Sequence, residues 1–227
     1  MLEVSNKFSL KAPKTNPELN GVSLHSITDK TEYLRVHFGK IEAIYDDESK
    51  ELLQKDRAEQ ENTKFDGDDS RYNYSHSESL KEIQHVYLRM HRYSAILAAY
   101  SYLEASMVRT CQKVPERPGK PEYPKAGIVS CYKYLKESAG ANFSSINSLW
   151  QELRTLESLR NCIIHSNGDV RNTNRPTWFT KIVHTTSGLN FIEENMVMIS
   201  KEYILSAISN IEGFLKHILS ELDNDGI

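Results

Sequence analysis

The stretch YSAILAAYSYLEASMV, residues 93–108, decides the fold that this sequence predicts. Its apolar side chains are spread nearly all round a helix of 3.6 residues per turn, instead of forming a stripe along one side. Such a helix needs other parts of the chain to cover most of its surface. We therefore expect a buried central helix that begins at Ser77 or Ser79, either of which can cap it, and reaches about Gln112.

Amphipathic helices are predicted on both sides of the central helix, because apolar residues recur there every three or four positions. The run KVPERPGKPEYPKAG, residues 113–127, predicts an extended connector, since proline lacks a backbone donor and fixes φ. Between residues 178 and 200, β-branched and aromatic residues around a Ser187–Gly188 turn predict a small hairpin. The flanking helices are expected over residues 29–62, 126–138, 144–165 and 200–222.

The domain organisation follows from these elements. Residues 1–28 are polar and interrupted by proline and glycine, which predicts an irregular N-terminal arm. Residues 29–227 are expected to form a single all-α domain, a bundle of about five helices with a small β-hairpin before the last one.

Composition and missing motifs exclude several function classes. The formal net charge of −3 gives no overall positive field for nucleic acid or acidic membranes, although a local basic patch remains compatible with it. Three cysteines without a CxxC pair fit neither a zinc site nor a disulfide framework, so we expect a reducing, cytoplasmic location. The sequence contains no HExxH, GxSxG, Walker or GxGxxG motif and no bilayer-spanning stretch. No metal, no cofactor and no membrane contact are expected.

One charged residue stands in an otherwise apolar seam. Steps of three and four along the helix ending at residue 165 run through positions 149, 153, 156, 160 and 163, and Arg160 lies among leucines and isoleucine. A buried, unpaired guanidinium costs several kcal/mol, so Arg160 must meet a carboxylate, a phosphate or a water-filled cleft. The apolar stripe of the central helix holds a single acid, Glu104, and we hypothesise that Glu104 pairs with Arg160.

The segment RNCIIH, residues 160–165, carries a family resemblance. It resembles the R-x4-6-H signature of the HEPN superfamily, in which a polar residue directly follows the arginine. The predicted layout of about residues 77–222 also resembles that of HEPN domains. In those domains a long buried helix comes early, the motif stands at the end of a later helix, and a final helix closes the bundle. Many are metal-independent endoribonucleases of CRISPR, toxin–antitoxin and phage-defence systems that act as homodimers with two facing motifs.

The resemblance implies a role for each motif residue. Arg160 would hold or neutralise the scissile phosphate, His165 would act in general acid–base transfer, and Asn161 would orient them. Nearby arginines would form a basic rim that binds single-stranded RNA; they are Arg154, Arg171 and Arg175. The implied partners are a second copy of the chain, RNA, and an antitoxin or other protein.

Two further interpretations remain open from the residues alone. If Arg160 pairs with Glu104, the arginine is a structural ion pair and the protein is a non-catalytic interaction module. Alternatively, the arginine and histidine line a pocket for a small ligand or nucleotide.

Overall fold

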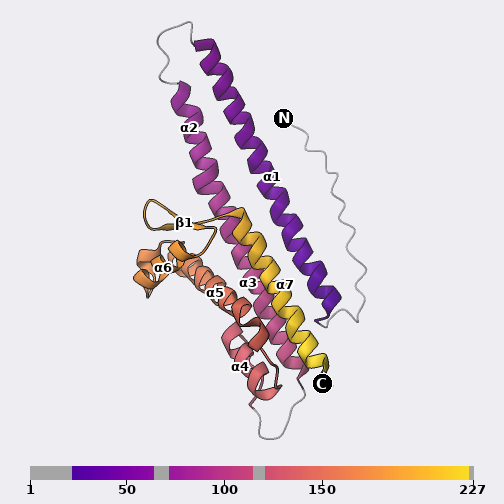
Figure 1. Cartoon of the computed structure of the whole chain (residues 1–227). Coiled ribbons are helices and arrows are strands. Elements are labelled where there is room, and N and C mark those ends of the chain that lie inside the picture. The colour runs from indigo at the N-terminus through magenta and orange to yellow at the C-terminus, as the bar shows by residue number, and fades with distance from the viewer. Residues whose placement is uncertain (1–21, 64–71, 115–120, 225–227) are drawn as a thin grey trace.

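The computed structural model describes residues 22–63, 72–114 and 121–224, which form an all-α bundle with one small β-hairpin (Figure 1). The helices are α1 (Leu24–Thr63), α2 (Tyr72–Glu82), α3 (Leu88–Lys113), α4 (Ile128–Ser138), α5 (Asn147–Ser166), α6 (Pro176–Thr185) and α7 (Lys201–Asn224). The hairpin strands are β1 (Leu189–Ile192) and β2 (Met196–Ile199). Shorter turns are η2 (Ile83–Tyr87), η3 (Ser144–Ile146) and η4 (Val170–Asn172). The predicted fold class is thereby confirmed.

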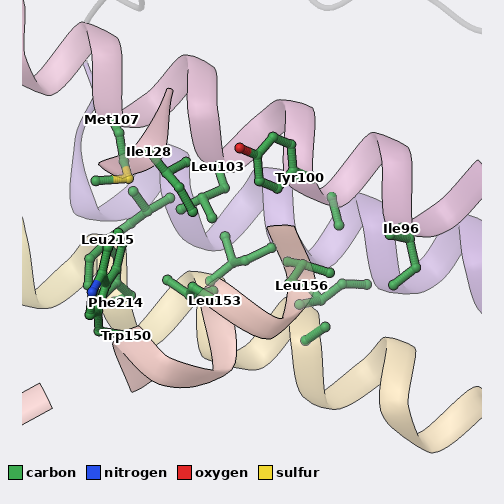
Figure 2. Packing of buried hydrophobic residues seen from close by; sticks show 14 of the residues in the cluster. Ile96, Tyr100, Leu103, Met107, Ile128, Trp150, Leu153, Leu156, Phe214 and Leu215 are labelled. Atoms are coloured by element: carbon green, nitrogen blue, oxygen red, sulfur yellow. The ribbon is translucent and has the colours of Figure 1, made fainter. Parts of the chain in front are cut away.

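Helix α3 is the central helix that the sequence predicts. It packs against α1, α4, α5 and α7, and Ile96, Leu103 and Met107 are completely buried along it. Figure 2 shows Leu103 and Met107 on the side of α3 that faces Leu153 of α5 and Phe214 of α7, with Ile96 further along α3. Complete burial of one such side chain contributes about 1.5–3 kcal/mol, so this contact region provides much of the stability of the bundle.

Helices α2, η2 and α3 form one continuous helix, with a single π-helical stretch at Ile83–Tyr87. It begins at Tyr72 and not at Ser77 or Ser79, so part of the loop expected over residues 63–77 is helical. In Figure 1 this helix runs antiparallel to α1, and together they form a long hairpin that extends beyond the start of α7.

The N-terminal boundary also differs from the prediction. Helix α1 begins at Leu24 and not at Asp29, because Ser23 caps it. The Ser26 backbone N–H donates to Ser23 Oγ at 3.1 Å, and the Ser23 N–H donates to Ser26 Oγ at 2.9 Å. This reciprocal pair satisfies two donors at the helix start, as a capping box does. Residues 24–28 of the expected irregular arm are therefore helical, and residues 1–21 lie outside the described residues.

A buried ion pair holds the long hairpin and the β-hairpin together. Glu42 of α1 is completely buried, and Arg92 of α3 donates to both of its carboxylate oxygens at 2.8 Å. Arg92 Nη1 also donates to the carbonyl oxygen of Ile199 in β2 at 3.0 Å. One guanidinium therefore joins α1, α3 and β2 in a fixed geometry.

The segment 178–200 differs from the prediction in two respects. Residues 178–185 belong to helix α6, which starts at Pro176, so the β-hairpin comprises only β1 and β2. Phe179 and Val183 are four residues apart and both are buried, which is the spacing of one helix face. The prediction of a strand had given more weight to the aromatic and β-branched residues, which favour strands. The hairpin turn lies at residues 193–195 and not at the predicted Ser187–Gly188, which precedes both strands. Glu193 and Glu194 have φ of 52° and 67° there, conformations that usually select Gly or Asn. With α2–α3 counted as one, the described residues hold six helices, in keeping with the predicted bundle of about five.

The remaining predicted elements are confirmed. The described part of the proline-rich connector, residues 121–127, contains no helix, and Gly140 follows the end of α4 with a φ of 77°. Helix α7 covers the predicted last helix. Within the described ranges, no helix combines the length and apolar character needed to cross a bilayer.

Candidate functional site

The candidate site lies at the C-terminal end of α5, where the R-x4-H segment is located. The helix ends because Asn167 and Gly168 take φ of 50° and 82°, and both of their N–H groups donate to the Cys162 carbonyl. Asn167 adopts this left-handed conformation although it is not glycine, as asparagine does more readily than most residues. The helix remains regular through Ser166, so His165 is still within it.

The β-hairpin holds this helix end in place. The Gly168 carbonyl accepts from the Val197 N–H at 3.0 Å, and the Tyr93 hydroxyl of α3 donates to the Val197 carbonyl at 2.6 Å. Gly168 leaves no room for a side chain, because a Cβ there would lie 1.9 Å from Tyr93 Oη. The end of α5 is thereby fixed relative to α3 and β2.

Arg160 is partly buried but does not form the predicted pair with Glu104. Its guanidinium lies over the Tyr100 ring, 5.3 Å from the centroid, and its Nη1 donates to Asn161 Oδ1 at 2.8 Å. Among the described residues no carboxylate lies within ion-pair distance of Arg160. Glu104 instead accepts from the Gly127 N–H at 2.9 Å and so fixes the start of α4. The aromatic face stabilises the arginine in place of a carboxylate.

The Tyr100 ring has a fixed orientation beneath the guanidinium. Its hydroxyl donates to Glu157 Oε1 at 3.3 Å, and the other oxygen of Glu157 pairs with Arg154 on the same helix. Burial, and then the nearby Glu157 carboxylate, raise the pKa of Tyr100, which keeps the phenol protonated as a hydrogen-bond donor. Arg154, predicted to bind RNA, is therefore neutralised by Glu157.

A pocket of about 230 Å³ opens beside this helix end. Asn161 and His165 of α5 line it, together with Arg175 just before α6 and Trp178 in the first turn of α6. His165 is exposed, and no hydrogen bond or ion pair within the described chain engages its ring. Trp178 is 46% exposed. The remaining lining residues are Ser158, Cys162, Ser166, Asn172, Thr173, Asn174 and Phe179. They make the wall rich in amides and hydroxyls.

Only one of the three predicted rim arginines is unpaired in the described structure. Arg171 donates to both oxygens of Asp169, at 3.0 and 2.6 Å, and this hydrogen bonding lowers the pKa of the Asp169 carboxyl. With Arg154 bound to Glu157, neither of these two arginines presents a free positive charge. Arg175 has no such partner in the described part of the chain and lines the pocket with His165.

The arrangement combines a histidine, two arginines without carboxylate partners, an amide and an exposed indole within one short region. Asn161 connects its two halves, because it accepts from Arg160 and also lines the pocket with His165. The described residues contain no cluster of His, Cys, Asp or Glu that could hold a metal ion. Such a set can bind an anion and move a proton.

Sequence reasoning missed Tyr100 and Trp178. Tyr100 was expected only as an apolar member of the central stripe, and Trp178 as part of a strand. A possible signal for Trp178 was its place two residues after Pro176, which favours the first turn of a helix.

Comparison of the chain with protein-family models, curated proteins and solved structures finds no match.

Proposed function

We propose that the chain is a metal-independent ribonuclease of the HEPN type that cleaves single-stranded RNA with Arg160 and His165. The observation that carries the proposal is the state of Arg160. Its guanidinium is held by Tyr100 and Asn161, while no carboxylate neutralises it in the described structure. A positive charge fixed in this way is suited to a phosphate oxygen, because it loses little freedom on binding.

The proposed reaction requires only the substrate and these side chains. The RNA 2′-hydroxyl attacks the adjacent phosphorus, the bond from phosphorus to the 5′-oxygen breaks, and a cyclic phosphate and a free 5′-hydroxyl result. His165 moves the proton between these oxygens, and Arg160 stabilises the charge that develops on the phosphoryl oxygens. Asn161 orients the guanidinium through its 2.8 Å hydrogen bond.

A homodimer would complete this site. Arg160 and His165 are five residues apart on a regular helix, so their side chains leave it about 140° apart. A second copy that faced the first would bring the histidine of one chain to the arginine of the other. Ile164 lies between them and is 47% exposed, an apolar side chain that such a contact would cover.

Trp178 and Arg175 support single-stranded RNA as the substrate. An exposed indole can stack on an unpaired base, which contributes about 1–3 kcal/mol, whereas a paired base would not be accessible to it. We expect Trp178→Ala to weaken the binding of a non-cleavable deoxy-substituted oligonucleotide about tenfold or more. The matched control is Val129→Ala, which removes another exposed apolar side chain, on α4.

The direct test is RNA cleavage in the presence of EDTA. The wild-type protein should cut a single-stranded RNA and leave cyclic-phosphate ends, and His165→Ala and Arg160→Ala should each lower kcat/KM about 100-fold or more. His25→Ala, which removes an exposed histidine at the start of α1, is the matched control and should retain full activity. Uncut RNA with the wild-type protein, or full activity in His165→Ala, would refute the nuclease and favour a non-catalytic interaction or ligand-binding module.

Mixing the two inactive variants tests the composite site. If each site takes its arginine and histidine from different chains, a mixed dimer of Arg160→Ala and His165→Ala contains one intact site, and activity returns. If both residues act within one chain, the mixture stays inactive, and the proposed composite site would be wrong.

A further inference from the structure

A second and larger pocket lies between α5 and α7 and shares no residue with the pocket of His165. Its volume is about 740 Å³, and the end of α6 with the following turn, residues 185–188, contributes to its lining. Its lining residues are Glu152, Leu153, Leu156, Thr185, Thr186, Ser187, Gly188, Ser200, Glu202, Tyr203, Ser206, Ala207 and Asn210. The proposed ribonuclease makes no use of any of them.

The charge of this lining is entirely negative. It holds two carboxylates, Glu152 and Glu202, and no lysine, arginine or histidine. Hydrogen bonds from its own backbone N–H and from the Ser200 hydroxyl lower the pKa of Glu202, so this group is ionised at neutral pH. Glu152 forms no ion pair within the described residues. The lining therefore disfavours phosphates and other anions and favours a cation.

Tyr203 gives an independent indication of a ligand. The residue is only 7% exposed, yet its hydroxyl has no hydrogen-bond partner in the described structure. Every fully buried side-chain oxygen in the described part of the chain has a hydrogen-bond partner. Because the Tyr203 hydroxyl has none, its oxygen must retain some exposed surface. Burial, and then the Glu152 carboxylate across the pocket, raise the pKa of Tyr203. A nearly buried phenol next to a carboxylate thus keeps an unused lone pair facing the pocket.

The apolar members of the lining are themselves buried. Leu153 and Leu156 of α5 are each 1% exposed, and Ala207 of α7 is 6% exposed, so they offer little apolar surface to a ligand. Recognition therefore rests on the carboxylates, the phenol and the hydroxyls, and a matching ligand carries charged donors on a slender body.

We propose that this pocket binds a small alkylamine of the polyamine class, with an ammonium group between Glu152 and the Tyr203 hydroxyl. The ammonium donates to the carboxylate and to the phenol oxygen, which fills the unused lone pair. The hydroxyls of the 185–187 turn and the amide of Asn210 accept from further amine groups.

The test is calorimetric titration of the intact chain with putrescine. One equivalent should bind, and butanediol, a neutral compound of the same chain length, should not. Glu152→Gln and Tyr203→Phe should each weaken binding about tenfold or more, because the first removes the negative charge that pairs with the ammonium and the second removes the oxygen that accepts its hydrogen bond. Glu51→Gln, an exposed glutamate of α1, is the matched control and should bind as the wild type does. Thermal melting of each variant shows whether the fold is intact.

The outcomes separate the proposal from its alternatives. Absence of putrescine binding, equal binding of butanediol, or unchanged affinity in a folded Glu152→Gln variant would each overturn it. Equal weakening by Glu51→Gln would indicate a general effect of net charge and would also overturn it. Because the measurement is binding in the absence of RNA, its result does not depend on whether the chain is a ribonuclease.

Discussion

The ion pair between Arg92 and Glu42 allows the sharpest prediction about the fold. Arg92→Met keeps the length and apolar stem of the side chain but leaves Glu42 completely buried without its partner. Removal of one member of a buried pair costs about 3–5 kcal/mol, and loss of the hydrogen bond to the Ile199 carbonyl adds about 1 kcal/mol. Against a typical total stability of about 5–15 kcal/mol, the variant should be close to unfolding at moderate temperature.

The large expected loss of stability in Arg92→Met comes from the unpaired, buried Glu42 carboxylate and not from the loss of the ion pair as such. The double variant Glu42→Met with Arg92→Met replaces both charges by apolar side chains of similar volume, and it should recover most of the lost stability. The two single variants and the double variant form a cycle, with urea unfolding followed by circular dichroism as the measurement.

A matched control removes a pair of the same type at the surface. Lys50→Met breaks the exposed pair between Lys50 and Asp47 on α1 and should leave the urea midpoint unchanged. The reasoning would be refuted if Arg92→Met cost less than about 1 kcal/mol, or if the double variant were as unstable as the single ones.

Three other predictions concern the helix end, acid stability and the cysteines. Gly168→Ala should destabilise the protein by about 2–4 kcal/mol, because a left-handed φ and a clash with a tyrosine hydroxyl act together; an unchanged melting temperature would contradict it. Burial raises the pKa of Glu212, but hydrogen bonds from Lys216 and Arg35 outweigh it and lower the pKa to about 2. The stability that this ionised carboxylate contributes is therefore complete above pH 4.5. That contribution should be lost as the pH falls from 4.5 towards 2, and Arg35→Met should flatten this part of a plot of unfolding free energy against pH. Burial raises the pKa of Cys162 to about 11, so iodoacetamide should label this thiol much more slowly in the native protein than in urea; equal rates would show that the thiol is accessible.

Local pattern was sufficient for the long helices. The apolar character of residues 93–108 predicts the central helix, and the stripe of residues 201–222 predicts α7, because each pattern is long enough for only one period to fit it. The same reasoning predicts that the Arg160 to His165 segment lies at a helix end, since Gly168 follows it. Short elements were less certain: residues 178–185 are rich in strand-forming residues, yet they are helical because burial of Phe179 and Val183 decides the matter.

The partner of Arg160 could not be predicted from spacing. Glu104 lies on the expected stripe of α3, one helical turn beyond Tyr100, but its carboxylate accepts from the N–H of Gly127, the last residue of the proline-rich connector. Which of these two side chains the guanidinium meets depends on how α5 is placed along α3, and no local signal encodes that relation.

The sequence by itself determined the class of fold, the long helices and the position of the Arg160, Asn161 and His165 group on one of them, because hydrophobic periodicity and caps act within a few residues. Tertiary structure alone decided that Arg160 rests on Tyr100 and that Arg154 and Arg171 are neutralised while Arg175 is not. It alone decided that one pocket opens at the end of α5 and another lies between α5 and α7. The physical reason is that pairing and cavity shape depend on how segments distant in the chain approach one another. For Arg160, a difference of one helical turn along α3 exchanges the Glu104 carboxylate for the Tyr100 ring.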